Sequence, residues 1–312
     1  MKNEFNPQDA IKSGTLALCM PLLVALVIAI IASIFTISSS NSTLQIVVNV
    51  LTELSFLLVV LLVCWKNKTK FPAATKLYAR PQKKYVGAAI FLGAICLLLF
   101  NPIISLWETL LSTMGYSISA ELPYSLDNVG LVILALICVG LIPAFCEETL
   151  FRGTAQNGVS GFGPIKSIAY AALLFSLMHQ NLQQLPYTFI LGIVSGILLY
   201  YSRSLWPSII FHFVNNGLVI LLMALPNVAD ILFCWWIALD GVLFAQILIS
   251  ILCVLLACLI IFFMVKFFHK QNPTQAQALT QEKMFANKLM LMPIIVGILL
   301  LIISTITKFG VL

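Results

Sequence analysis

The feature that most constrains this chain is its series of continuous apolar runs, most of which reach about 20 residues. A helix rises ~1.5 Å per residue, so a run of this length spans the hydrocarbon core of a bilayer. The runs do not alternate between polar and apolar residues, which argues against a transmembrane β-barrel. Hydrophobic types make up 61% of the 312 residues and charged types 9%, whereas soluble domains are about 25% charged. We therefore predict an all-α, polytopic transmembrane helix bundle and exclude a soluble enzyme or a disordered chain.

Nine spans can be drawn, within a range of eight to ten. They cover residues 15–38, 44–65, 85–107, 128–151, 167–181, 185–202, 205–224, 243–265 and 289–307. The first run is too long for the core of a signal peptide, so we expect it to be a retained span. The fifth run is short and must be tilted or shielded by its neighbours. Segment 229–242 is broken by Asp240 and Gly241, so it either extends the eighth span or lies in the membrane interface.

Lysine and arginine set the expected orientation. With the N-terminus in the cytoplasm, 16 of the 17 basic residues lie inside, among them Lys2, Lys283 and those of the loop 66–84, and only Lys308 lies outside. Loop acids such as Glu121 then fall outside. Because this distribution follows the positive-inside rule, we predict a cytoplasmic N-terminus. The short loops and the lack of a targeting sequence favour a multi-pass protein of a bacterial plasma membrane. Topology and contact with anionic lipid explain the formal charge of +6, so no nucleic-acid partner is expected.

Ionisable residues at membrane depth are costly, so each needs a reason. The predicted spans hold seven of them: Glu53, Glu147, Glu148, Arg152, His179, His212 and Asp240. Five of the seven lie between residues 147 and 212, which marks the middle of the chain as its functional part. We accordingly divide the chain into an N-terminal transmembrane region (1–127, three spans), a catalytic helical core (128–225) and a C-terminal transmembrane region (226–312). We interpret Glu53 as facing the bundle with an unknown partner, and Asp240 as interfacial.

The segment CEETLFRG places two acids and a base at the inner end of the fourth span. On a helix, Glu148 and Arg152 are four residues apart and share a face, in the order that favours an ion pair. Glu147 is turned about 100° away, so it is left free to take a proton. Pro143 removes one backbone N–H four residues earlier, and we expect a kink just ahead of Glu147.

Two histidines lie on the following apolar segments at matching depth. Phe175 and His179 share one helix face, and His212 and Asn216 share another. A carboxylate and an imidazole can together activate a water as a general base. A second imidazole and an amide can donate hydrogen bonds to an oxygen that gains charge, as an oxyanion hole does. The set is suited to hydrolysis of an amide bond in a desolvated pocket.

At these residues the chain resembles the CAAX prenyl protease and bacteriocin-processing family (CPBP, also called Abi) of intramembrane glutamate endopeptidases. EETLFR fits EExxxR, FSLMH fits FxxxH and HFVNN fits HxxxN, and the match covers residues 128–220. The resemblance implies an all-helical endopeptidase that cleaves a peptide or protein without a cofactor. We place the cleavage near the cytoplasmic face, because Glu147 and Arg152 lie at the inner end of their span. Some members of the family are described as immunity or scaffold proteins, so a non-catalytic membrane protein is the main alternative.

The resemblance also assigns roles to single residues. It implies that Glu147 and His179 activate the water, and that His212 and Asn216 form the oxyanion site. The supporting residues in the same motifs are Glu148, Arg152 and Phe175. The substrate is not specified: a prenylated C-terminal motif, a bacteriocin leader and a signalling peptide all remain open, as does the oligomeric state.

Other chemistries fit parts of the same segment. One glutamate and two histidines could hold zinc with an open position for water, although the helical HExxH arrangement is absent from the sequence. LGIVSGIL resembles the GxSG of serine proteases with the spacing shifted by one, and Gly192 and Gly196 are better explained as a close helix contact. Cys146 could act as a nucleophile beside Glu147. A proton-coupled transporter would need Glu53 and Asp240, but no symmetric pair of broken helices is apparent.

Overall fold

The computed structural model describes residues 5–36, 38, 42–118, 126–271, 284 and 287–310. Every regular element in these ranges is a helix, and eight helices are long and apolar enough to cross a membrane. The prediction of a polytopic helical bundle, and of a multi-pass membrane protein, is therefore confirmed. Lys2, Glu121 and Lys283 lie outside the described residues. The side of the membrane on which the N-terminus lies stays a prediction.

The eight candidate spans follow one another along the chain. They are α1 (Pro7–Ile34), α2 (Ser42–Asn67), α4 (Lys83–Thr113), the composite helix α5–η1–α6–η2 (Val129–Gln156), α8 (Leu185–Ser202), α9 (Trp206–Ala224), α11 (Leu243–Gln271) and the continuous pair η5–α12 (Lys288–Lys308), in which α12 is Met292–Lys308. The shorter helical elements are α3 (Phe71–Ala74), η3 (Ser160–Phe162), α7 (Pro164–Met178), α10 (Pro226–Ile237) and η5 (Lys288–Leu291).

The first span begins well before the predicted residue 15, because polar residues cap it. The Asn6 side chain accepts hydrogen bonds from the backbone N–H groups of Gln8 and Asp9, and the Asp9 side chain accepts one from the Asn6 N–H. This reciprocal capping box satisfies donors that a helix start would otherwise leave unpaired. Pro7 suits the first helical position because its missing N–H would have no partner there. Hydropathy alone does not detect a helix start of this kind.

Two further predictions are settled by helix length. The predicted fifth span is α7, which has only 15 residues and is mostly buried, so it is shielded by its neighbours as expected. Segment 229–242 does not extend the eighth span: most of it forms the separate 12-residue helix α10. Asp240 lies exposed in the turn after α10, where its carboxylate accepts a hydrogen bond from the Gly241 N–H.

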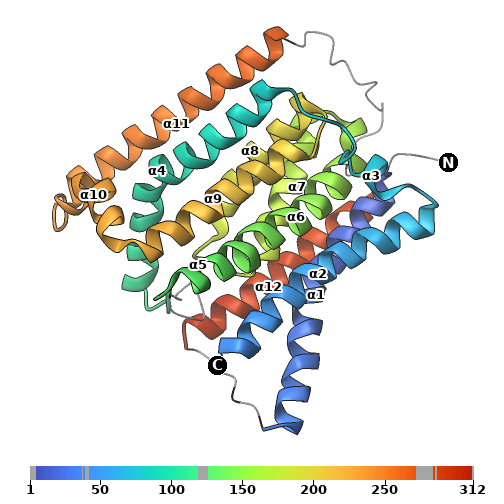
Figure 1. Cartoon of the computed structure of the whole chain (residues 1–312), viewed down its shortest axis with the longest axis horizontal. Coiled ribbons are helices and arrows are strands. Elements are labelled where there is room, and N and C mark those ends of the chain that lie inside the picture. Colours follow the sequence, from blue (N-terminus) through green and yellow to red (C-terminus); the bar gives the residue numbers. More distant parts are fainter. Residues whose placement is uncertain are drawn as a thin grey trace.

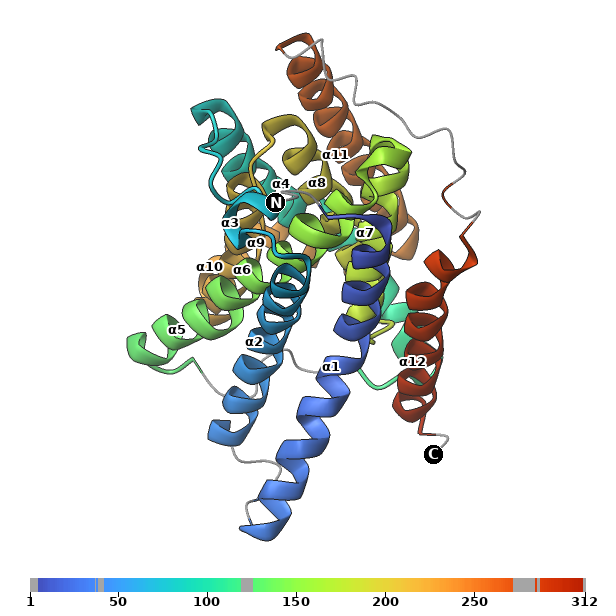
Figure 2. The same cartoon turned by 90° about the vertical axis from the view of Figure 1, so that its right-hand side faces the viewer.

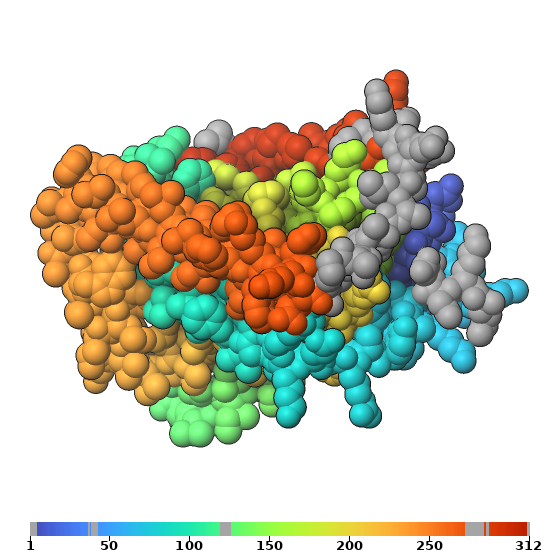
Figure 3. Space-filling view, turned by 90° about the horizontal axis from the view of Figure 1, so that it is seen from above, coloured from blue at the N-terminus to red at the C-terminus, as the bar shows by residue number. Residues whose placement is uncertain are grey.

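The helices pack around two large apolar cores and a small third one that includes Ala144 and Leu205. The first core joins α1, α2, α7 and α12 to the C-terminal half of the composite helix, and the second joins α4, α8, α9 and α11. Figure 1 shows α11, α4, α9 and α6 side by side in that order, and Figure 2 shows α1, α2 and α12 on the opposite side of the bundle. The outer helices expose large apolar side chains, as lipid-facing surfaces do. In Figure 3, α11 (orange) lies across this outer surface beside α4 (teal).

Helices α7 and α8 approach each other through glycine. A methyl group at Gly192 would lie 2.8 Å from the Cα of Ala172, and one at Gly196 would lie 2.9 Å from the side chain of Ile168. Small residues at this spacing let two backbones come close within a membrane. The interpretation of Gly192 and Gly196 as a close helix contact is thus confirmed. The contact brings α8 and α7 together next to the composite helix.

Replacing Gly192 with alanine should destabilise the bundle, because the new methyl group would overlap the Ala172 backbone. Overpacking of this kind costs about 1–3 kcal/mol. Thermal unfolding of the purified protein in detergent, followed by tryptophan fluorescence, should show a lower midpoint. Gly87→Ala is the matched control, since no atom lies within 4 Å of its Cβ position, and it should not lower the midpoint. An unchanged midpoint for Gly192→Ala would contradict the close contact.

Candidate active site

The helix that carries the two glutamates is not a regular α-helix. Residues Leu136–Leu141 form a π-helix, in which the Ile142 N–H donates to the Ile137 carbonyl five residues earlier, and a second π-helix runs from Thr149 to Gln156. The α-helical segment Ile142–Glu148 lies between them. Wide turns of this kind often occur at functional sites. The backbone ahead of Glu147 is therefore irregular, whereas the kink expected at Pro143 stays a prediction.

Pro143 explains one polar contact of the site. In an α-helix the Val139 carbonyl would accept a hydrogen bond from residue 143, but proline has no N–H to give. The side chain of Asn216 donates from Nδ2 to this carbonyl at 3.3 Å. Asn216 is thereby fixed against the composite helix, and its amide keeps a second N–H and its oxygen.

Glu148 is the centre of a buried polar cluster. Its Oε2 atom lies 3.2 Å from Nε of Arg152 and accepts a hydrogen bond from the Ser195 hydroxyl, and its Oε1 atom lies 3.1 Å from Nδ1 of His212. The side chains of Glu148 and Arg152 are 1% and 0% exposed. The predicted pairing of Glu148 with Arg152 is therefore confirmed. The contacts with α8 and α9 were not predicted, because no local pattern connects Ser195 or His212 to Glu148.

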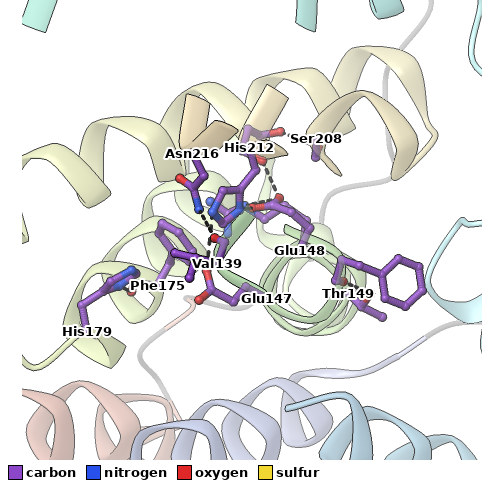
Figure 4. Close-up of polar contacts among 12 residues, drawn as sticks. Val139, Glu147, Glu148, Thr149, Phe175, His179, Ser208, His212 and Asn216 are labelled. Carbon is purple, nitrogen blue, oxygen red and sulfur yellow. Dashed lines mark hydrogen bonds and ion pairs between the residues drawn. The ribbon is translucent and has the colours of Figure 1, made fainter. Parts of the chain in front are cut away.

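Aromatic rings cover the buried cation. The Arg152 guanidinium carbon lies 4.3 Å from the centroid of the Phe175 ring, which is a cation–π contact. The same ring contacts both histidines edge-on, with centroid distances of 5.0 Å to His179 and 5.7 Å to His212. Figure 4 shows Phe175 beside His179, with His212 and Asn216 entering from α9. Phe175 thus supports three of the predicted site residues at once.

The hydrogen-bond partners fix the tautomers of the two histidines. His212 presents Nδ1 to a carboxylate that is itself paired with Arg152, so Nδ1 carries a proton and donates to Glu148. His179 presents Nδ1 to the Phe175 carbonyl at 2.9 Å, and a carbonyl can only accept. In both rings Nε2 is therefore the atom left for other partners. Nε2 of His212 lies 3.8 Å from Oε2 of Glu147.

These side chains surround one cavity of about 370 Å³. It is lined by the predicted site residues Glu147, Phe175, His179, His212 and Asn216. A volume of this size is typical of a site for a small ligand or part of a larger one. Glu147 and His179 thus border the same space from α6 and the end of α7, although no direct contact between them is observed among the described residues.

Two residues from outside the motifs, Glu53 and Tyr187, also line the cavity. Glu53 lies on α2 and faces the cavity. The sequence predicted that it faces the bundle but did not identify its partner. Asn215, next to Asn216, donates from Nδ2 to the Tyr187 hydroxyl at 2.6 Å and holds α9 against α8. Glu53 was marked by its charge at membrane depth, whereas nothing in the local sequence marks Tyr187.

Neither of the alternative nucleophiles, Ser195 and Cys146, is among the residues that line the cavity. The Ser195 hydroxyl is used by Glu148, and Cys146 is buried in the first apolar core. For zinc, the structure shows no group of three or more His, Cys, Asp or Glu side chains arranged to hold a metal ion, within the part of the chain that it describes. Independence from a cofactor stays a prediction.

Comparisons with known proteins agree with the three motifs. Residues 129–218 match the family model described as type II CAAX prenyl endopeptidase Rce1-like. The curated protein "membrane-embedded CAAX protease MroQ" of Staphylococcus aureus (strain USA300) is 23% identical over 165 residues, covering 51% of this chain and 66% of its own length, just under two thirds. No solved structure matches. The resemblance to the CPBP family is thereby confirmed.

Replacing Arg152 with methionine should destabilise the fold strongly, because it would leave the Glu148 carboxylate buried beside no fixed cation. Breaking one partner of a buried ion pair costs about 3–5 kcal/mol. The double variant Glu148→Gln/Arg152→Met should recover part of this loss in thermal unfolding, since it no longer buries a charge. Arg80→Met, at an exposed loop position, is the control. Equal losses for Arg152→Met and Arg80→Met would show that Arg152 does not compensate Glu148.

Proposed function

We propose, from the premise that residues 129–218 form an Rce1-like region, that the protein is an intramembrane peptidase. It would hydrolyse a peptide bond with a water activated by Glu147 and His179, and stabilise the oxyanion through His212 and Asn216. The single observation that carries this proposal is that these four side chains, from α6, the end of α7 and α9, line one cavity among membrane-spanning helices. We expect the cleavage to take place near the cytoplasmic face.

The two histidines suit different halves of the reaction. In the proposed mechanism His212 acts as an imidazolium: its Nδ1–H donates to the Glu148 carboxylate, and its Nε2–H donates to the oxyanion. The Nδ1–H of His179 donates to a neutral carbonyl, so its Nε2 carries a lone pair that can accept a proton. This difference supports His179 as the partner of Glu147 in water activation, and His212 as a stabiliser of charge.

The proton balance of the reaction follows from these roles. The water oxygen attacks the carbonyl carbon of the scissile bond while one water proton passes to Glu147, assisted by His179. The carbonyl oxygen becomes an oxyanion and accepts hydrogen bonds from His212 and the free N–H of Asn216. Collapse of the intermediate breaks the C–N bond, and the proton passes from Glu147 to the leaving amine. The new carboxylic acid then gives its remaining proton to the amine, so the products are a carboxylate and an ammonium group, and no co-reactant besides water is needed.

The substrate is proposed only at the level of its chemical class. We propose a peptide or protein that reaches the site from the membrane or its cytoplasmic face, in a bacterial cell membrane. The name of the S. aureus relative points to CAAX-type cleavage in that protein. For this chain the candidate substrates are a prenylated C-terminus, a bacteriocin leader and a signalling peptide. Mapping the cleaved peptides would distinguish among these three.

Removing the base should abolish turnover without unfolding the protein. Membrane peptides of cells that produce the wild-type chain would be compared by mass spectrometry with those of Glu147→Gln and His179→Gln cells. A positioned general base contributes about 10²–10⁴-fold, so we expect wild-type-specific products to fall below detection in both variants. Asp230→Asn, at an exposed acid on α10, should match the wild type.

The same comparison tests the non-catalytic alternative. If folded Glu147→Gln and His179→Gln variants give the wild-type peptide pattern and keep the cellular phenotype, the protein acts as an immunity or scaffold protein and the peptidase proposal is wrong. Thermal unfolding in detergent would establish that each variant is folded. Glutamine keeps the size of both the glutamate and, closely, the imidazole side chain, so large packing effects are not expected.

A further inference from the structure

Glu53 is the one acid of the cavity that the proposed reaction does not use. It lies on α2, outside residues 129–218, so the matched family region does not include it. The residue is half-buried, and its Oε2 atom is buried. An ionisable side chain at this depth is costly unless it has a partner.

The partner is Glu147. The two carboxyl groups line the same cavity and lie within hydrogen-bonding reach of each other. Oε2 of each is buried and receives no hydrogen bond from any residue in the described ranges. An ionised carboxylate can only accept hydrogen bonds, so two ionised groups in contact would have no donor between them. A single proton held by the pair supplies that donor, and it also avoids two like charges side by side.

The surrounding charges decide which group keeps the proton. Glu147 lies 3.8 Å from Nε2 of His212, and Arg152 lies five residues further along the same composite helix. Glu148 on α6 opposes the effect of these two bases, but it is itself paired with Arg152. Among the described residues, no basic side chain forms an ion pair with Glu53. The negative charge of the pair is therefore better placed on Glu147 and the proton on Glu53.

We infer that Glu53 is a protonated carboxylic acid that donates a hydrogen bond to the Glu147 carboxylate and holds it in position. Glu53 is a positioning residue: it acts on the reaction through Glu147. The inference rests on the proposed function for the role of Glu147 as a base, whereas the carboxyl–carboxylate pair exists independently of that role. A side chain that replaces Glu53 should therefore keep the function only if it is a neutral hydrogen-bond donor.

Infrared spectroscopy tests the pair without any substrate. The purified full-length chain in phosphatidylglycerol vesicles should show the carbonyl stretch of a buried protonated carboxyl group. The band should disappear in Glu53→Gln and persist at a shifted frequency in Glu147→Gln, because Glu53 keeps its proton there. Asp230→Asn should leave it unchanged. Absence of the band from the wild type, or its persistence in Glu53→Gln, would overturn the inference.

Activity distinguishes positioning from mere filling of space. Glutamine is the same size as glutamic acid and also donates a hydrogen bond, so Glu53→Gln membranes should form the wild-type-specific peptides at a rate similar to the wild type. Glu53→Leu cannot donate and should lower this rate about tenfold to a hundredfold, the loss expected for one hydrogen bond to a charged group. Equal activity of the leucine variant and the wild type would contradict the positioning role.

The two readouts separate this inference from the proposed function. If the infrared pattern is as expected but Glu147→Gln leaves the peptide pattern unchanged, the pair stands and the peptidase proposal fails. If Glu147→Gln abolishes the peptides but the band persists in Glu53→Gln, the peptidase proposal stands and the pair is wrong. Both variants are close in size to the native residue, and thermal unfolding would show that each is folded.

Discussion

The buried carboxylate of Glu148 is the constraint on which the site depends. An unpaired charge in the hydrocarbon region costs several kcal/mol, so the helices around Glu148 must bring it compensating partners. Arg152 comes from the same helix, Ser195 from α8 and His212 from α9. Because three helices meet at one carboxylate, its neutralisation also fixes the ring of His212, whose other nitrogen faces Glu147. The contacts that neutralise Glu148 thus also position His212 in the candidate active site.

The irregular backbone of the composite helix helps to position the side chains of the site. Pro143 cannot give the Val139 carbonyl its α-helical hydrogen bond, and Asn216 donates one to this carbonyl from α9. A π-helix lies on each side of α6, the segment that carries the two glutamates. Distortions at such positions have an energetic cost that the surrounding packing must offset. Here the offsetting contacts come from side chains that also line the cavity.

Much of the fold and of the candidate site could be predicted from the sequence, because the signals are local. Apolar runs predict the spans, and four-residue spacing predicts the pairing of Glu148 with Arg152. The start of α1 was missed because a capping box, and not hydropathy, sets it. The contacts of Glu148 with Ser195 and of Glu53 with Glu147 join helices far apart in the chain. No single-sequence pattern reports such distances, although the charge of Glu53 at membrane depth marked it as a residue that needed a partner.

The most direct test of the central claim is to follow the oxygen of the attacking water. Membranes that contain the wild-type chain would be incubated in water labelled with oxygen-18, and their peptides analysed by mass spectrometry beside those of membranes with Glu147→Gln. The account predicts new peptides with one labelled oxygen in their C-terminal carboxylate in the wild type, and none of these peptides in the variant. Identical peptides in both samples, or wild-type-specific peptides without the label, would contradict it.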